Sequence, residues 1–332
     1  QIIIQTNANW GNAQFILDDS ELEKNGKSDV FIVKSHLKES TITDKTILSA
    51  IASTAAPLTS DTKKIDLALG YRAMIVTKDS SHKVFRRQGS YRGGGNINGV
   101  AMTELIVIDA NGNVDPTTAP IFTYTNVEEL TVYNLDIPEI KINGGNVITI
   151  VPEFIKEGRI EDRIQINSGL DVQRPNTRVE NLNHSIIGEH KKQGSINGAT
   201  YTGFFCATDT SDVTFYNCKL QGRRLYASGR SSYEISINMV NNCVFEKCEQ
   251  TNFYVDPDTY FYNTENPKKN TLLSLSVGTN DLSPCWGTMG GNDLKNFAYI
   301  NSRIARLFSQ MVIVLSITFK IQRSEYVHFI QK

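Results

Sequence analysis

A seven-residue pattern of polar and apolar positions occurs four times in the second half of the chain. Its first position is Asn or Asp, its fourth is always apolar, its sixth is Asn in three of the four copies, and its seventh is apolar or small. Each copy predicts a short β-strand whose fourth residue is buried, because alternate residues of a strand face opposite sides. The copies cover residues 176–182, 212–218, 242–248 and 296–302.

The spacing of the copies favours a repeating fold. They begin 36, 30 and 54 residues apart, and one coil of a solenoid takes roughly 20–30 residues. The first two steps therefore fit one coil plus a loop, and the third fits two coils or one coil with a long insertion. A sandwich of short antiparallel strands is the alternative. The recurrent Asn favours a parallel β-helix, in which it can adopt a left-handed turn and donate its amide to the next coil.

The first 150 residues differ from this pattern. Strands at 2–4 and 14–17 predict a first coil, and the polar stretch that follows, to residue 64, contains a short helix within 43–53. Residues 65–143 predict a small antiparallel β-subdomain inserted into the solenoid, and a strand at 147–150 returns to the main β-helix of residues 144–307. The strands expected in the subdomain are 73–77, 83–86 and 105–109, with tight turns at 111–113 and 143–145.

The two ends of the chain are unusual. Residues 308–332 lack both the alternation and the Asn positions, and the apolar run 311–319 is too short to span a bilayer. An apolar end would leave the solenoid uncapped, so we expect a truncated or frame-disturbed C-terminal tail. The chain opens on Gln1 inside a predicted strand, which suggests a fragment whose own N-terminus is missing.

Composition narrows the functional classes. The 332 residues are 40% hydrophobic and 21% charged, with a net charge of −1, as in ordinary globular proteins. This balance gives no electrostatic case for nucleic-acid binding. The glycine-rich loop 92–99 lacks the Lys and Ser or Thr of a phosphate-binding loop.

The five cysteines match no strong zinc-binding pattern. Cys218 and Cys248 share the seventh position of the repeated pattern. We expect stacked, buried free thiols there, with a disulfide between them as the alternative.

Several segments resemble the pectate-lyase-like right-handed parallel β-helix superfamily, namely residues 181–184, 217–220, 286–292 and 301–304. The opening of the chain and the block 83–115 are similar to β-helix tail-spike and appendage proteins of phages and prophages. The resemblance covers most of residues 1–306 and is specific for the fold rather than for a reaction. It implies lyase or hydrolase activity on polysaccharides, an extracellular or virion-associated location, and a homotrimer, which no residue pattern demonstrates.

The chain departs from this superfamily in two places. Residues 231–234 read Ser-Ser-Tyr-Glu where a Gly-Thr-Tyr-Asp-like segment is expected, so a carboxylate is kept but lengthened. After residues 302–307 an Asp and a His are expected on the next turn, and the unusual tail begins there instead.

Glycoside hydrolysis requires two carboxylates roughly 5–9.5 Å apart, and lyase chemistry requires a base together with a cation or metal. Strands of adjacent coils are roughly 4.8 Å apart, so carboxylates one or two coils apart meet either requirement. The first candidate cluster is Arg230, Tyr233 and Glu234. Arg230 could hold an anionic group, Tyr233 could stack on a sugar or donate a proton, and Glu234 could act as acid or base. The alternative is a solvated polar loop.

His184 and Asp209 are the other catalytic candidates. His184 follows a repeat strand, so we expect it to project from a coil edge, where it could be a general base or orient a substrate. A hydrogen-bonded turn histidine is the alternative. Asp209 lies close to a coil start and could serve the site. Asp212 occupies the first position of the pattern and is expected to be structural.

Candidate substrate contacts lie further along the chain. Trp286 beside glycines could stack on a sugar or fill the core, and Lys295 and Arg303 could contact an anionic polymer or remain solvated. Asp256 and Asp258 could ligate Ca²⁺, but their motif is too short to predict a metal site, so we expect no metal or other cofactor.

The resemblance, together with these candidate residues, implies a polysaccharide-degrading β-helix protein, a lyase or a glycoside hydrolase, that acts on a surface or extracellular glycan. The alternative is a non-catalytic glycan-binding or structural tail or appendage protein. Two carboxylates that converge in one groove favour the enzyme. The expected partner is a polysaccharide or cell-surface glycan, and neither nucleic-acid binding nor membrane insertion is expected.

Overall fold

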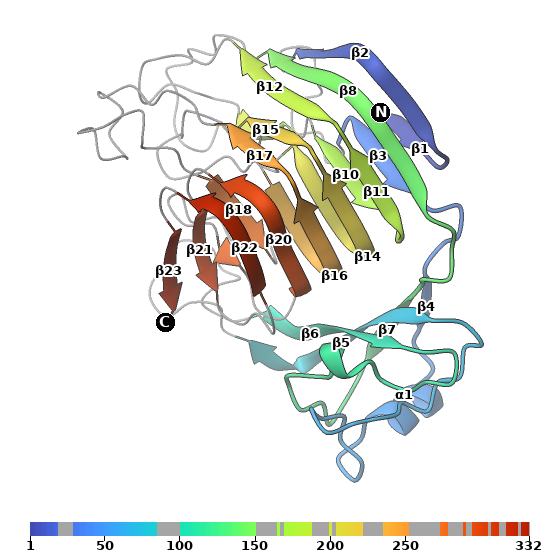
Figure 1. Cartoon of the computed structure of the whole chain (residues 1–332). Helices are drawn as coiled ribbons and strands as arrows, with labels where there is room; N and C mark the ends of the chain where they lie inside the picture. The colour runs from blue at the N-terminus through green and yellow to red at the C-terminus, as the bar shows by residue number, and fades with distance from the viewer. Residues whose placement is uncertain are drawn as a thin grey trace.

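The computed structural model shows a mainly β fold with one α-helix among the residues it describes (Figure 1). A large sheet with only parallel pairings curls nearly closed, through 272° over seven strands, and a four-stranded antiparallel sheet lies beside it. The described residues are 1–18, 29–84, 100–150, 165–166, 169–187, 199–200, 204–221, 235–251, 273–277, 288–289, 294–304, 307–311, 317–324 and 327–331.

The parallel strands pair in three ladders, which we call A, B and C. Ladder A joins β1 (Ile2–Ile4), β3 (Phe31–Lys34), β10 (Leu170–Gln173), β14 (Phe205–Tyr216), β16 (Ile235–Glu246) and β18 (Leu273–Val277). Ladder B joins β2 (Ala8–Asp18), β8 (Ile140–Ile150), β11 (Thr177–Glu180), β14, β16, β20 (Leu294–Ile304) and β22 (Ile317–Ser324). Ladder C joins β2, β8, β12 (Asn183–Ile187), β15 (Lys219–Gln221), β17 (Glu249–Thr251) and β20.

The remaining parallel strands are short. β21 (Leu307–Met311) pairs with β18, β19 (Thr288–Met289) and β23 (Val327–Gln331), while β9 (Gln165–Ile166) pairs only with β13 (Ala199–Thr200). The unusual tail therefore supplies β21, β22 and β23, whose backbone continues the parallel pairing without the Asn positions. No helix in the described part of the chain is long and apolar enough to cross a membrane.

The four copies of the repeated pattern lie in register on neighbouring strands. Val179 pairs with Phe215, Phe215 with Phe245, and Phe245 with Tyr299. The fourth position is buried as predicted at Val179, Phe215 and Phe245, where the two Phe rings stack with centroids 4.6 Å apart. Burial of each such side chain stabilises the fold by about 1.5–3 kcal/mol.

The predicted left-handed Asn residues lie at the corners between the ladders. All eight described non-glycine residues with positive φ fall into three stacked columns. Two columns are the first and sixth positions of the pattern, and the third holds Asp209 and Met239. This conformation tolerates Asn and Asp better than other non-glycine residues. The first-position column is Asn176, Asp212 and Asn242, and the sixth-position column is Asn181, Asn217 and Lys247.

The side chains of the sixth column form the predicted amide ladder. Asn217 Nδ2 donates to Asn181 Oδ1 at 2.6 Å, and Asn181 Nδ2 donates to Asn143 Oδ1 at 2.8 Å. The ladder extends further than predicted, because Asn143 Nδ2 donates to Asn9 Oδ1 at 3.3 Å.

The tight turn predicted at 143–145 is instead a bend within β8, since that strand continues to Ile150. Gly144 has a φ of +82°, and a Cβ there would lie 2.4 Å from the carbonyl oxygen of Gly11 on the neighbouring strand. Glycine is therefore required at this corner.

The thiol prediction is also confirmed, since Cys218 and Cys248 are buried thiols that form no disulfide. Cys206 and Cys243 are likewise buried thiols that form no disulfide.

The antiparallel sheet contains β4 (Ser40–Ile42), β7 (Glu129–Asn134), β5 (Ala73–Val84) and β6 (Val100–Ile108), in that order. It reaches further toward the N-terminus than the expected start at residue 65, because β4 pairs with β7. The predicted helix is α1 (Lys45–Ile51), and the Asp44 side chain caps it by accepting from the Thr46 and Ile47 amides. A short 3₁₀ helix, η1, spans Pro116–Thr118.

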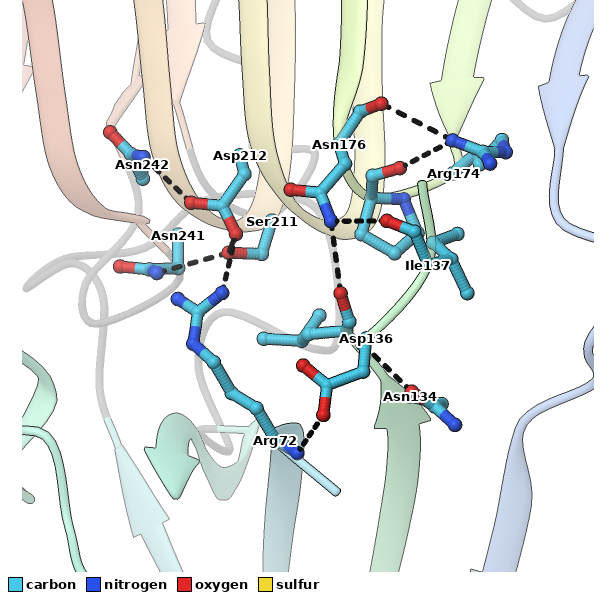
Figure 2. Close-up of polar contacts among 12 residues, drawn as sticks. Arg72, Asn134, Asp136, Ile137, Arg174, Asn176, Ser211, Asp212, Asn241 and Asn242 are labelled. Atoms are coloured by element: carbon cyan, nitrogen blue, oxygen red, sulfur yellow. Dashed lines mark hydrogen bonds and ion pairs between the residues drawn. The ribbon is translucent and has the colours of Figure 1, made fainter. Parts of the chain in front are cut away.

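The two sheets are joined by polar contacts, which Figure 2 shows, and by an apolar cluster. Arg72 Nη1 lies 2.9 Å from Asp212 Oδ2, and Asn176 Nδ2 donates to the carbonyl oxygens of Leu135 and Ile137 at 2.9 and 2.8 Å. Met239 packs into an apolar cluster with Met74, Leu105, Val107 and Leu135 of the antiparallel side. The left-handed corners of the curled sheet thus fix the position of the smaller sheet.

Candidate functional site

A pocket of about 140 Å³ lies where the curled sheet meets the antiparallel sheet. The segment after β3, the end of β7 and the ladder A strands β10 and β14 all contribute to its lining. The charged residues that line it are Lys34, Lys38, Glu39 and Asp209.

One wall of the pocket follows from strand alternation. Val33, Val172 and Ala207 are fully buried in the core of the curled sheet. The next residue of each strand must therefore face outward, and these residues are Lys34, Gln173 and Thr208, all of which line the pocket. Lys34 and Gln173 are paired in register.

Asp209 and Glu39 bring two carboxylates to this pocket. Asp209 sits at a corner of β14 with a φ of 49°, and Glu39 precedes β4. Burial raises the pKa of the Tyr133 hydroxyl group well above its usual value, and the negative charges of Asp209 and Glu39 raise it further. Tyr133 is therefore protonated at neutral pH, and its O–H group can donate a hydrogen bond.

Asp171 lies beside the polar wall, on the same strand as Gln173. Only 6% of Asp171 is exposed, and its Oδ2 atom accepts a hydrogen bond from Gln173 Nε2 at 2.7 Å. Burial raises the pKa of the Asp171 carboxyl group, while hydrogen bonds from Gln173 and Thr208 act in the opposite direction. Within the described part of the chain its Oδ1 atom has no hydrogen-bond partner.

Of the predicted catalytic residues, the structure brings Asp209 to the pocket. Glu39 and Tyr133 were not singled out from the sequence, because they lie far from Asp209 along the chain and outside any repeated pattern. The only sequence signal is that Glu39 and Lys38 form a charged pair within the polar stretch before the helix.

His184 does not project from an edge, and that expectation is wrong. It pairs with Val147, whose side chain faces the core, and only 7% of His184 is exposed. Its Nε2 atom lies 2.9 Å from Thr149 Oγ1, and its ring stacks on Phe204 with centroids 4.0 Å apart. The structure therefore gives His184 a place in the interior, outside the pocket lining.

Asp212 has the structural place expected of it. Its Oδ1 atom accepts from Asn242 Nδ2 at 2.7 Å, and its Oδ2 atom accepts from Arg72. The Asp212 carboxylate therefore links the curled sheet to the antiparallel sheet through Arg72.

The other candidates are not brought to the pocket by any described contact. Lys295 pairs with Asn241 and Arg303 with Glu249 along β20, but their side chains lie outside the described part. The residues wholly outside it are Arg230, Tyr233, Glu234, Asp256, Asp258 and Trp286.

Within the described residues, no group of three or more His, Cys, Asp or Glu side chains could hold a metal ion. The described residues bring to the pocket two carboxylates, a neutral tyrosine, two ammonium groups and neutral hydrogen-bonding side chains.

Comparison with known proteins gives no family. No model of a known protein family matches the chain, and no curated protein matches it.

Proposed function

We propose that the curled sheet is a right-handed parallel β-helix and that the pocket beside it is the glycan-cleaving site of a polysaccharide-degrading enzyme. The fold part rests on the register of the three ladders, the stacked left-handed corners and the asparagine ladder. The resemblance of the repeat segments to the pectate-lyase-like superfamily supports the same fold.

The convergence of Glu39 and Asp209 on one pocket carries the functional proposal. Glycoside hydrolysis uses one carboxylic acid to protonate the glycosidic oxygen and one carboxylate to activate water or attack the sugar. A cleft that offers both groups beside a hydrogen-bond donor such as Tyr133 suits this reaction. Hydrolysis suits the pocket better than a lyase reaction with Tyr133 as base. The raised pKa keeps the Tyr133 hydroxyl group protonated at neutral pH, so it is not available to take up a proton.

The size and lining of the pocket suit a small part of a polymer. Its volume is about 140 Å³, below the roughly 300–1,000 Å³ of sites for drug-sized ligands. A polysaccharide would therefore place one sugar unit in the pocket and extend beyond it. Lys34 and Lys38 can donate to sugar hydroxyls or to an acidic substituent.

The same proposal includes an extracellular or virion-associated location, a cell-surface glycan as the partner and a homotrimer as the assembly. These parts rest on the resemblance to tail-spike and appendage proteins. In such a setting the two catalytic carboxylates would meet their substrate at the host surface.

The test is a cleavage assay with wild-type protein and the variants Asp209→Asn and Glu39→Gln. The panel contains neutral polysaccharides, read by new reducing ends, and uronate polymers, read also by the absorbance of unsaturated products. Asp61→Asn and Glu139→Gln, which alter exposed carboxylates outside the pocket lining, are the matched controls. Each pocket variant should lose about 10²-fold or more in rate, and each control should keep its rate.

Two results would speak against this function. Unchanged cleavage in both pocket variants would place the reaction elsewhere on the molecule. Glycan binding without cleavage by the wild-type protein would favour the alternative, a non-catalytic glycan-binding or structural tail protein.

A further inference from the structure

Asp171 is an unusual residue for its position in β10. Leu170 and Val172 face the core and are fully buried, so Asp171 faces the outer side of ladder A. Its register partners there are Ile32 and Cys206, which offer its carboxylate no strong hydrogen-bond donor. A nearly buried carboxylate in such surroundings opposes folding unless other groups satisfy it.

Among the described residues, the side chains that interact with the Asp171 carboxylate belong to the pocket. Gln173 Nε2 donates to Oδ2 at 2.7 Å, and the Thr208 side chain acts on the same carboxyl group by lowering its pKa. Both Gln173 and Thr208 line the pocket. Asp171 thus lies behind the polar wall and touches two of its members.

The contact with Asp171 gives the Gln173 amide a direction. A carboxylate can only accept hydrogen bonds, so the NH₂ end of the Gln173 amide must face it. The carbonyl oxygen, Oε1, then lies on the other branch of the amide. No hydrogen bond to Oε1 is found among the described residues, and Gln173 itself lines the pocket.

We propose that Asp171 is a positioning residue of the pocket, which holds the Gln173 amide in one orientation so that Gln173 Oε1 accepts a hydrogen bond from a sugar hydroxyl group. The identity of the ligand rests on the proposed function, whereas the orientation of the amide does not. Asp171 itself touches no substrate in this arrangement, because it acts through Gln173.

The Asp171→Asn variant distinguishes a role in orienting the Gln173 amide from a role in stabilising the fold. Asn has the same shape but carries both a donor and an acceptor, so the Gln173 amide is no longer restricted to one orientation. The neutral side chain is also easier to bury. We therefore expect an unchanged or higher Tm together with weaker ligand binding.

The binding experiment is a double-mutant cycle with wild type, Asp171→Asn, Gln173→Ala and the double variant. The probes are cellotetraose, tetraacetylchitotetraose and tetragalacturonate, titrated by calorimetry. Loss of one neutral hydrogen bond corresponds to about a fivefold to tenfold weaker Kd. Each single variant should show this loss, and the double variant should bind no more weakly than Gln173→Ala.

A second measurement needs no ligand. The side-chain NH₂ resonances of Gln173 are identified in ¹⁵N-labelled protein by their disappearance in Gln173→Ala. They should move in Asp171→Asn, and in the wild type they should shift as Asp171 titrates. If they move as expected while no tetrasaccharide binds to the wild type, the positioning role holds and the glycan function fails.

The proposal is overturned by either of two results. In the first, the Gln173 resonances stay in place in Asp171→Asn. In the second, Asp171→Asn lowers the Tm and its effect on Kd adds fully to that of Gln173→Ala.

Discussion

Arg72 and Asp212 form an ion pair across the two sheets, with Nη1 and Oδ2 2.9 Å apart. Arg72 precedes the antiparallel strand β5, and Asp212 sits at a left-handed corner of the curled sheet. The same carboxylate accepts from Asn242 in the next strand. One residue of the repeated pattern thus joins neighbouring strands to each other and to the second sheet.

We expect Asp212→Ala to destabilise the protein more than Arg72→Met. Arg72→Met removes only a partly exposed ion pair, which contributes about 0.5–1 kcal/mol. Asp212→Ala also loses the bond from Asn242 and places alanine in the left-handed region, which alanine tolerates less well than aspartate, so its cost is about 2–4 kcal/mol. Urea unfolding measures both, and Asp212→Asn, which keeps the corner conformation, should fall between them. Equal losses from the two variants would contradict a corner role for Asp212.

The asparagine ladder provides a second prediction. Asn181 donates to Asn143 and accepts from Asn217, and its φ is 57°. Asn181→Ala should cost about 2–3 kcal/mol, because it loses two hydrogen bonds and keeps a β-carbon in a strained conformation. Asn181→Gly loses the same bonds without the strain, so it should cost less. If thermal unfolding shows glycine to be the worse replacement, backbone strain is not part of this corner.

Asp171 should make stability depend on pH in an unusual direction. Burial raises the pKa of its carboxyl group above the ordinary value of 3.8. The folded state then binds more protons than the unfolded state, so stability is lost as pH rises from about 3.8 through the raised folded pKa. Asp171→Asn should therefore be more stable than wild type at neutral pH, and this difference should vanish at low pH.

Chemical unfolding of both proteins at a series of pH values measures that difference. Asp61→Asn, which alters an exposed residue, should instead give a curve parallel to that of the wild type. A constant difference between Asp171→Asn and wild type at all pH values would contradict the raised pKa.

The buried thiols should be unreactive in the folded protein. Burial raises the pKa of Cys218 strongly, and the neighbouring Cys248 adds to this effect. Burial likewise raises the pKa of Cys243. Since the thiolate is the reactive form, maleimide should label Cys218 and Cys243 only after unfolding, as peptide mapping by mass spectrometry can show. A disulfide between Cys218 and Cys248 under mild oxidation would be the contrary result.

The repeated strands could be predicted because their corners restrict the residue type. Asn176, Asp212 and Asn242 recur at one position, since few other residues tolerate a left-handed backbone. The neighbouring strands β2 and β8 do not show the pattern, because glycine stands at the corner that matches the sixth position. Gly11 and Gly144 pair with each other and have positive φ, but glycine is too common to reveal a register.

The pocket could not be predicted, because it depends on how the second sheet docks. Tyr133 and Glu39 meet Asp209 only through contacts such as that between Arg72 and Asp212, which are 140 residues apart. His184 shows a related difficulty. Its position after a repeat strand suggested an exposed edge, but the inward direction of its side chain is set by pairing with Val147 on β8.

Residues 35–139 connect two strands at a place where the adjacent pair of strands is connected by only three residues. Between β10 and β11 the chain turns with residues 174–176 alone, whereas the neighbouring strands β3 and β8 are joined by residues 35–139. Lys34 pairs with Gln173, and Ile140 pairs with Thr177. The long and the short connection therefore leave and re-enter the parallel sheet at residues that are in register. A chain in which Arg-Pro-Asn takes the place of residues 35–139 should therefore retain all its parallel pairings. It would lack Glu39 and Tyr133, so one deletion separates the parallel architecture of this protein from the proposed site.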